Sequence, residues 1–248
     1  MRSVVAAALR KVGGEMLSWL YPHCCVACGE VLPCGGSEVL CAACDGVLAV
    51  RPAYACAVCG RGMAQPPGAD GVCTDCQEER YAFVRVYPMY PYNETVRGMI
   101  LRYKNGGHTA AARDIATLMV ARFPLDALPA IDMLVPVPPR RESLRERGFG
   151  QTVLLARHLA RLYGLPCGEQ ALAYVRATRK QGFLNADERR KNVDSAFGAA
   201  DATAGKRILL LDDVFTTGST ANACARALME AGAKVVYVMT VAASIREA

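Results

Sequence analysis

ILLLDDVFTTGST, residues 208–220, is the stretch of sequence that decides the fold of this chain. Four apolar residues run without polar alternation into Asp212 and Asp213, a pattern typical of a strand buried on both faces of a parallel sheet. A turn of hydroxyl residues and glycine follows, and the small residues of 221–231 predict a helix. Ligands of parallel sheets bind at the carboxyl ends of the strands, so the acids and the turn mark a candidate site.

The turn has the chemistry of a phosphate site. The first N–H groups of a helix have no partner inside it and carry partial positive charge, so they can hold a phosphate. Side-chain hydroxyls add donors, and Gly218 allows close approach of the backbone. These hydroxyls belong to Thr216, Thr217, Ser219 and Thr220. Two carboxylates beside such a site can accept hydrogen bonds from vicinal sugar hydroxyls, so the predicted ligand is a ribose 5-phosphate.

Two other interpretations of this stretch explain less. A solvated turn in which Ser219 caps the helix accounts for one hydroxyl, but not for four hydroxyls and two acids. An ATPase would need a G-x-x-x-x-G-K-[ST] loop to accompany the apolar strand that ends in Asp. The only Gly-Lys pair is 205–206, where Arg207 follows and Ala200 occupies the position of the first glycine. The ATPase is therefore excluded.

Asp-Asp followed by Thr-Thr-Gly-Ser-Thr resembles the phosphoribosyl diphosphate (PRPP) signature of type I phosphoribosyltransferases. The resemblance implies that Asp212 and Asp213 meet the ribose 2′ and 3′ hydroxyls as catalytic-site residues. It also implies that 216–220 wraps the 5′-phosphate, with Mg²⁺ bound alongside PRPP.

The first third of the chain is rich in cysteine. Ten of the twelve cysteines lie between residues 24 and 76, and eight of them form C-x-x-C pairs. This spacing lets one tight turn present two thiolates to the same ion, and the gaps of 12 and 13 residues between pairs predict two zinc-ribbon halves. Sequential pairing gives one site from Cys25, Cys28, Cys41 and Cys44 and a second from Cys56, Cys59, Cys73 and Cys76. Interleaved pairing and an iron–sulfur cluster stay open.

Other uses of the cysteines are disfavoured. Disulfides require an oxidising compartment, and no export signal is seen. A thioredoxin-like redox motif would be a single pair in a βαβ setting. A closed four-thiolate zinc site leaves no open coordination position, so we expect two structural zinc ions that supply most of the folding energy of this module.

Composition limits the number of domains and the partners. The 248 residues suffice for one domain of roughly 150 residues and a smaller module. The net charge of +6 favours phosphate-bearing partners without indicating nucleic acid. No apolar stretch is long enough to span a membrane, and we expect a cytoplasmic protein. We predict an amphipathic helix over 1–20, the double zinc ribbon over 21–80 and the second domain over 81–248.

Strands and helices are predicted to alternate after residue 80. The sequence patterns predict strands over 83–90, 132–137, 171–175, 208–211 and 235–241, and helices over 93–103, 110–123, 151–163 and 221–231. Such alternation indicates an α/β fold, a parallel sheet covered on both faces.

A second basic segment, Val135–Arg141, ends a predicted strand and is followed by Arg145, Arg147, Gly148, Phe149 and Gln151. Together with the cysteine module, its V-P-V-P and R-x-R-G-F-x-Q motifs resemble the ComF/GntX family. This resemblance implies a parallel-sheet type I phosphoribosyltransferase fold preceded by a double zinc ribbon, with 135–141 as the pyrophosphate loop. Because three prolines there lack N–H groups, pyrophosphate contact should depend on Arg140, Arg141 and Mg²⁺. A solvated basic helix start is the alternative.

A third basic segment covers 176–192. By the same resemblance it is the mobile loop that closes over the leaving pyrophosphate and excludes water, with Lys180 or Arg179 neutralising the departing charge. An ordinary solvated loop is the alternative. Arg102 and Lys104 are weaker candidates for the site.

Two functional hypotheses follow. The first is a PRPP-binding phosphoribosyltransferase whose acceptor and turnover the sequence leaves open. The second is a DNA-binding protein, because the ComF-like proteins that the sequence resembles are associated with the handling of incoming single-stranded DNA during natural competence. Zinc ribbons and arginine loops would then bind the DNA backbone, and the PRPP site would be regulatory or vestigial. Expected partners are PRPP, single-stranded DNA and competence helicase-type proteins, while homodimer formation stays open.

Overall fold

The computed structural model describes residues 23–33, 36, 38–105, 109–140, 144, 150–175 and 196–245. The predicted N-terminal helix over 1–20 lies outside these residues. Arg141 and the predicted mobile loop with Lys180 also lie outside them.

A four-stranded parallel sheet forms the centre of the molecule, with the strand order β3–β8–β7–β4. Its strands are β3 (Val86–Pro91), β4 (Met133–Pro136), β7 (Arg207–Phe215) and β8 (Val235–Ala243). The apolar run 208–211 lies in the inner strand β7 and is fully buried. The predicted parallel sheet is therefore confirmed.

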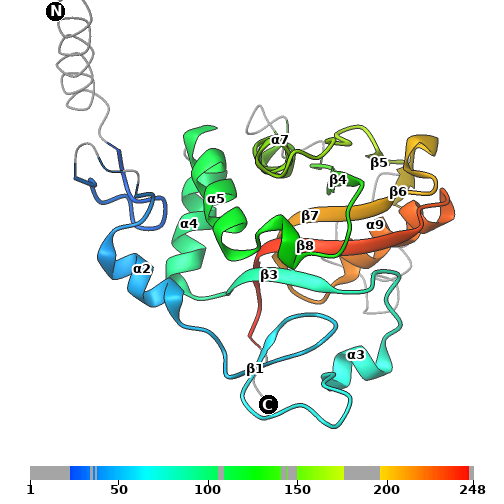
Figure 1. Ribbon diagram of the computed structural model, residues 1–248, viewed down its shortest axis with the longest axis horizontal. Coiled ribbons are helices and arrows are strands. Elements are labelled where there is room, and N and C mark those ends of the chain that lie inside the picture. The colour runs from blue at the N-terminus through cyan, green and yellow to red at the C-terminus, as the bar shows by residue number, and fades with distance from the viewer. Residues whose placement is uncertain are drawn as a thin grey trace, which may run out of the picture.

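Helices cover both faces of this sheet (Figure 1). Leu209 and Leu211 of β7 belong to the core that contains the buried side chains of α4 (Glu94–Asn105), α5 (Thr109–Arg122) and α7 (Gln151–Tyr163). Ile208 and Leu210 belong to the opposite core, which contains those of α9 (Ser219–Glu230). Alternate residues of a strand point to opposite faces, so one uninterrupted apolar strand serves two cores.

The structure differs from the sequence expectation at three places. β3 begins at Val86 and not at 83, because the backbone bends over 82–84, where Phe83 stacks on Tyr81 with ring centroids 4.7 Å apart. β7 continues through the two acids to Phe215, since Asp212 pairs with Thr240 of β8. The strand predicted over 171–175 is β5 (Leu172–Tyr174), which pairs antiparallel with β6 (Phe197–Ala199) in a separate small sheet. β6 has no counterpart among the strands predicted from the sequence.

Short elements complete the described part of the chain. The cysteine-rich module contains α2 (Ala42–Ala49), the antiparallel pair β1 (Tyr54–Ala55) and β2 (Gly62–Met63), and α3 (Thr74–Glu78). Two 3₁₀ turns, η1 (Leu125–Ala127) and η3 (Asp201–Thr203), lie in the second domain. Within the described ranges, every helix is too short or too polar to cross a membrane.

The second half of the cysteine module covers part of the open edge of the sheet. β3 is an edge strand, and its Val86 N–H donates to the carbonyl oxygen of Val58, 2.8 Å away. Pro88, two residues further on, faces the same edge and has no N–H to offer. Gly60 fits closely against this strand, because a Cβ there would lie 2.4 Å from Cδ of Pro88 and 2.8 Å from the Val86 carbonyl oxygen.

We predict that Gly60→Ala destabilises the protein more than Gly71→Ala does. Both glycines have positive φ, 66° and 71°, so each substitution carries a left-handed strain of about 1–2 kcal/mol. Only Gly60 adds a backbone clash, since the nearest contact of a Cβ at Gly71 is 3.7 Å away. Thermal unfolding of the two variants measures the difference, and equal melting temperatures would contradict the close packing of this module on β3.

Candidate functional site

The two acids lie at the carboxyl end of β7, in a network of short contacts. The N–H of Asp213 donates to Oδ1 of Asp212 at 2.8 Å, and the N–H of Val214 donates to Oδ1 of Asp213 at 2.7 Å. The Lys104 ammonium forms an ion pair with Oδ2 of Asp213. Lys104 was only a weak candidate from the sequence, and the structure brings it directly to the acids.

Lys104 is positioned by buried polar groups. The Tyr103 hydroxyl donates to the backbone carbonyl of Gln151, and Nε2 of Gln151 donates to the carbonyl of Lys104 at 3.4 Å. Both Tyr103 and Gln151 are buried. The end of α4 and the start of α7 are thereby joined beside the acids. Arg102, in contrast, donates to the carbonyl of Cys28 and connects α4 to the cysteine module.

Asp212 is an unfavourable place for a negative charge. Burial, together with the adjacent Asp213 carboxylate, raises the pKa of Asp212 well above its usual range. A ligand that offers hydroxyl donors, or a cation that accompanies it, would stabilise the ionised carboxylates. The pair is thus suited to bind such a ligand.

The hydroxyl turn is open to solvent, whereas its glycine is buried. The side chains of Thr216, Thr217 and Ser219 are exposed, and Oγ1 of Thr217 lies 2.8 Å from Oγ of Ser219. Gly218 precedes α9 with φ of 79°, and a Cβ there would meet the Phe215 ring at 2.7 Å. The turn therefore presents hydroxyls at the start of a helix, as the sequence predicted.

Arg140 lies on the same side of the sheet as the acids. Both Arg140 and Asp212 are close enough to Tyr174 to act on its hydroxyl. Burial raises the pKa of Tyr174, the Arg140 charge lowers it, and the Asp212 charge raises it further. The segment before Arg140 is attached to the signature strand, because the Val137 N–H donates to the Leu211 carbonyl at 2.8 Å. Tyr174 is a neighbour of the site that the sequence analysis did not identify.

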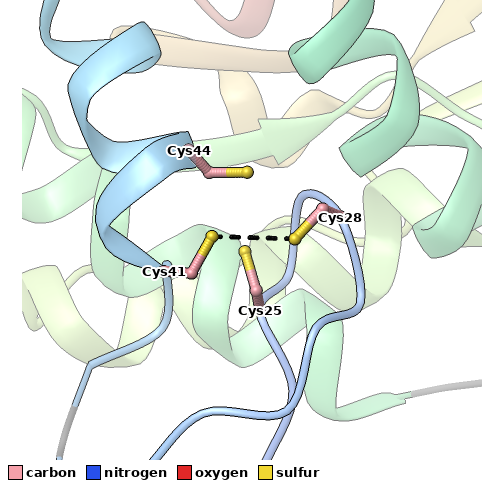
Figure 2. Close-up of side chains that lie close together, drawn as sticks. All are labelled: Cys25, Cys28, Cys41 and Cys44. Atoms are coloured by element: carbon pink, nitrogen blue, oxygen red, sulfur yellow. Dashed lines mark hydrogen bonds between the residues drawn. The ribbon is translucent and has the colours of Figure 1, made fainter.

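The eight cysteines of the C-x-x-C pairs form two groups in sequential pairing. In each group all four sulfurs lie within 4.8 Å of one another. Figure 2 shows the first group, with Cys41 and Cys44 at the start of α2 and Cys25 and Cys28 in the preceding loop. The Sγ–Sγ distances are 3.7 Å for Cys28–Cys41 and 3.8 Å for Cys59–Cys73. A tetrahedral zinc site with bonds of about 2.3 Å has sulfurs about 3.8 Å apart, so both groups fit zinc.

Backbone N–H groups prepare one thiolate in each group. Although burial opposes ionisation, the N–H groups of Cys28 and Cys41 lower the pKa of Cys25 to about 6. The same balance lowers the pKa of Cys56 to about 7, with its sulfur accepting the Cys73 N–H at 3.3 Å. The metal binds the deprotonated thiolate, so the backbone N–H groups that stabilise the Cys25 and Cys56 thiolates favour metal binding at neutral pH.

Arg61 connects the second cysteine group to the hydroxyl turn. Its Nε donates to Sγ of Cys59 at 3.3 Å, Nη2 to the Asp75 carboxylate at 2.7 Å and Nη1 to the carbonyl oxygen of Thr216 at 3.3 Å. Its guanidinium carbon lies 5.9 Å from the Phe215 ring centroid. Only 7% of Arg61 is exposed, and its burial is compensated because all three guanidinium nitrogens donate to a partner.

Two further contacts join the same parts of the chain. The Tyr81 hydroxyl donates to the Thr217 carbonyl at 3.3 Å, and the Ala82 N–H donates to Oδ1 of Asn222 at 2.8 Å. The residues after the cysteine module therefore support the turn and the first turns of α9. This role of Arg61 has no signal in the sequence, because a single arginine after a C-x-x-C pair is compatible with any surface position.

Comparison with known proteins agrees with this geometry. Residues 16–77 match the family described as Double zinc ribbon domain, and residues 146–247 match the Phosphoribosyl transferase domain. The chain is a double zinc ribbon joined to a phosphoribosyltransferase domain. This confirms the fold expected from the resemblance to ComF/GntX proteins, a parallel α/β sheet of the phosphoribosyltransferase type preceded by a cysteine-rich zinc-ribbon module.

Several relatives carry names that refer to DNA use or competence. "DNA utilization protein YhgH" of Salmonella typhi is 29% identical over 214 residues, 80% of this chain and 94% of the relative. "Competence protein ComFC" of Bacillus subtilis is 27% identical over 202 residues, 79% of this chain and 80% of the relative. YhgH of Escherichia coli K12 is 36% identical over 107 residues, and the chain spans about half of its length, 47%.

Among solved structures, a glutamine PRPP amidotransferase from B. subtilis aligns over 57% of this chain and 30% of its own, at 23% identity. The TM-score of this alignment is 0.40.

We predict two zinc ions per chain by native mass spectrometry. Cys44→Ser and Cys59→Ser should each remove one of them, because each breaks one four-thiolate group. Cys167→Ser is the matched control, since Cys167 belongs to neither group, and it should keep both ions. Iron in place of zinc, or two zinc ions still bound in Cys44→Ser or Cys59→Ser, would contradict this assignment.

Asp212→Asn should stabilise the ligand-free protein at high pH. A carboxyl whose pKa is raised on folding contributes its stability at low pH and loses it as the pH rises toward the folded pKa. Asparagine stays neutral, so the variant should melt about 2–4 °C above wild type at pH 8, about 1 kcal/mol, with a smaller difference at pH 5. Asp201→Asn, at an exposed acid, serves as control. A difference that is independent of pH would refute the electrostatic origin.

Arg61→Ala should destabilise the protein by about 2–3 kcal/mol, because it removes the guanidinium donors from the Asp75 carboxylate and from the partly buried Thr216 carbonyl oxygen. Hydrogen exchange should also accelerate in 215–220 but not in β8. Arg97→Ala removes an arginine from an exposed ion pair with Glu94 and should change stability by less than 1 kcal/mol. If exchange at the turn stays unchanged in Arg61→Ala, the proposed support of the turn is wrong.

Proposed function

We propose that this protein binds PRPP at the carboxyl end of β7. The observation that carries the proposal is the exposed hydroxyl turn at the start of α9, adjacent to two carboxylates on the inner strand of the sheet. The turn would hold the 5′-phosphate, and Asp212 and Asp213 would accept hydrogen bonds from the ribose hydroxyls. The match to the phosphoribosyltransferase domain supports this assignment.

Charge at the site suits the rest of the ligand. Arg140 is exposed beside Tyr174 and would contact the pyrophosphate, with Arg141 and Lys180 added by the family resemblance. Mg²⁺ bound with PRPP would neutralise pyrophosphate charge. A site of this kind acts by positioning and charge stabilisation and needs no side-chain nucleophile. Lys104 holds Asp213 in the ligand-free protein, so we expect the ion pair to rearrange when ribose hydroxyls arrive.

Calorimetric titration with PRPP, with and without Mg²⁺, tests this proposal. Ser219→Asp is the most informative variant, because an acid at the first helical position is compatible with the helix but repels a phosphate. It should weaken PRPP binding at least tenfold. Thr117→Asp adds the same charge to an exposed position on α5 and should bind as wild type does. Absence of PRPP binding in the wild type would refute the proposal.

We further propose a role in the use of DNA, which the names of relatives aligned over most of their length favour. In that case the protein binds single-stranded DNA and the PRPP site is regulatory. Fluorescence anisotropy with a labelled oligonucleotide, on wild type and Asp212→Asn/Asp213→Asn, separates the two activities. DNA binding that survives the loss of PRPP binding indicates two independent sites. The relatives' names support neither a helicase-type partner nor a homodimer.

A further inference from the structure

A cavity of about 270 Å³ lies between the second half of the zinc module and the edge strand β3, and its described lining contains no residue of the phosphate turn 216–220. Its walls come from three places: residues 51–62, strand β3 and the end of α5. This volume is close to the lower end of the range typical of small-molecule sites. The function proposed above does not use this cavity.

Three guanidinium groups line the cavity without acidic partners. Arg51, Arg85 and Arg122 belong to its walls, while no Asp or Glu is among the described residues that line it. None of the three forms an ion pair with another described residue. Burial and the Arg51 charge lower the pKa of Arg122, so the Arg51 and Arg122 charges repel each other. An anion in the cavity would relieve this repulsion.

Aromatic rings lie directly beside these charges. The Arg85 guanidinium lies 5.3 Å from the Tyr87 ring centroid, and that of Arg122 lies 5.2 Å from the Tyr90 centroid. Tyr87 packs edge to face on Phe123, with centroids 5.8 Å apart. Guanidinium planes and aromatic rings both stack on nucleobases, and arginine forks bind phosphate oxygens in a bidentate manner.

We propose that this cavity binds a phosphorylated mononucleotide. The three arginines would hold its phosphate, and the half-buried Tyr87 ring would stack on its base. The proposal does not depend on PRPP binding at β7. The small volume favours a single nucleotide over a longer strand.

Calorimetric titration of the zinc-loaded full chain with adenosine and uridine 5′-monophosphates tests the proposal. We expect at least one of them to bind with micromolar affinity. Unphosphorylated nucleoside and inorganic phosphate should each bind at least tenfold more weakly, because each lacks half of the contacts. Arg51→Ala and Arg85→Ala, both at exposed arginines, should each weaken nucleotide binding at least tenfold. Arg97→Ala removes an equal charge elsewhere and should have no effect.

A second variant excludes the phosphate turn as the binding site. Ser219→Asp should lose PRPP binding and keep mononucleotide binding, so failure of the two proposals can be told apart. The inference is overturned if neither mononucleotide binds to the wild type, or if Ser219→Asp abolishes nucleotide binding while the arginine variants retain it. It is also overturned if phosphate alone binds as tightly as the nucleotide. Binding of an oligonucleotide without binding of any mononucleotide would likewise overturn it.

Discussion

The buried guanidinium of Arg61 is the interaction on which the arrangement of the two domains depends. Its charge is tolerated inside the protein only because a sulfur, a carboxylate and a backbone carbonyl receive its N–H groups together. The sulfur belongs to Cys59 of the second cysteine group, the carboxylate of Asp75 lies between Cys73 and Cys76 in the chain, and the carbonyl oxygen of Thr216 begins the hydroxyl turn. The metal that would fix Cys59 therefore also fixes one end of the turn. The zinc module has no open coordination position for catalysis, but it contributes to the geometry of the candidate site at the hydroxyl turn, which contains none of its cysteines.

The negative charges of Asp212 and Asp213, unlike the charge of Arg61, are not fully compensated inside the protein. Two carboxylates at the end of one strand repel each other, and burial makes the ionised form of Asp212 still less favourable. In the ligand-free protein Lys104 pairs directly with Asp213, and its charge compensates Asp212 only in part. A site with uncompensated charge is less stable when empty than a neutral one, and it gains more from a ligand that brings donors or a cation. This difference between the empty and the occupied states is the physical reason for placing both acids there.

How much could be predicted from the sequence depends on how local each feature is. The apolar run 208–211 and the C-x-x-C spacing each specify a structure within about ten residues, and both predictions were correct. Lys104 is more than a hundred positions away from Asp213, and Arg61 lies 155 positions from Thr216, so no local pattern connects them. The arginine-lined cavity combines three distant segments and was likewise invisible. β6 was missed because three residues, Phe-Gly-Ala, give no periodic signal.

The edge strand β3 determines how this protein can and cannot assemble. Sheets commonly recruit further chains by adding a strand to an exposed edge, which requires a row of free N–H donors and carbonyl acceptors. Here the first donor of β3 is already engaged by Val58, and Pro88 removes the next one. A foreign strand laid along this edge would find an interrupted ladder. Intermolecular β-augmentation is thus suppressed at β3, and any self-association through this part of the molecule has to use side-chain contacts instead.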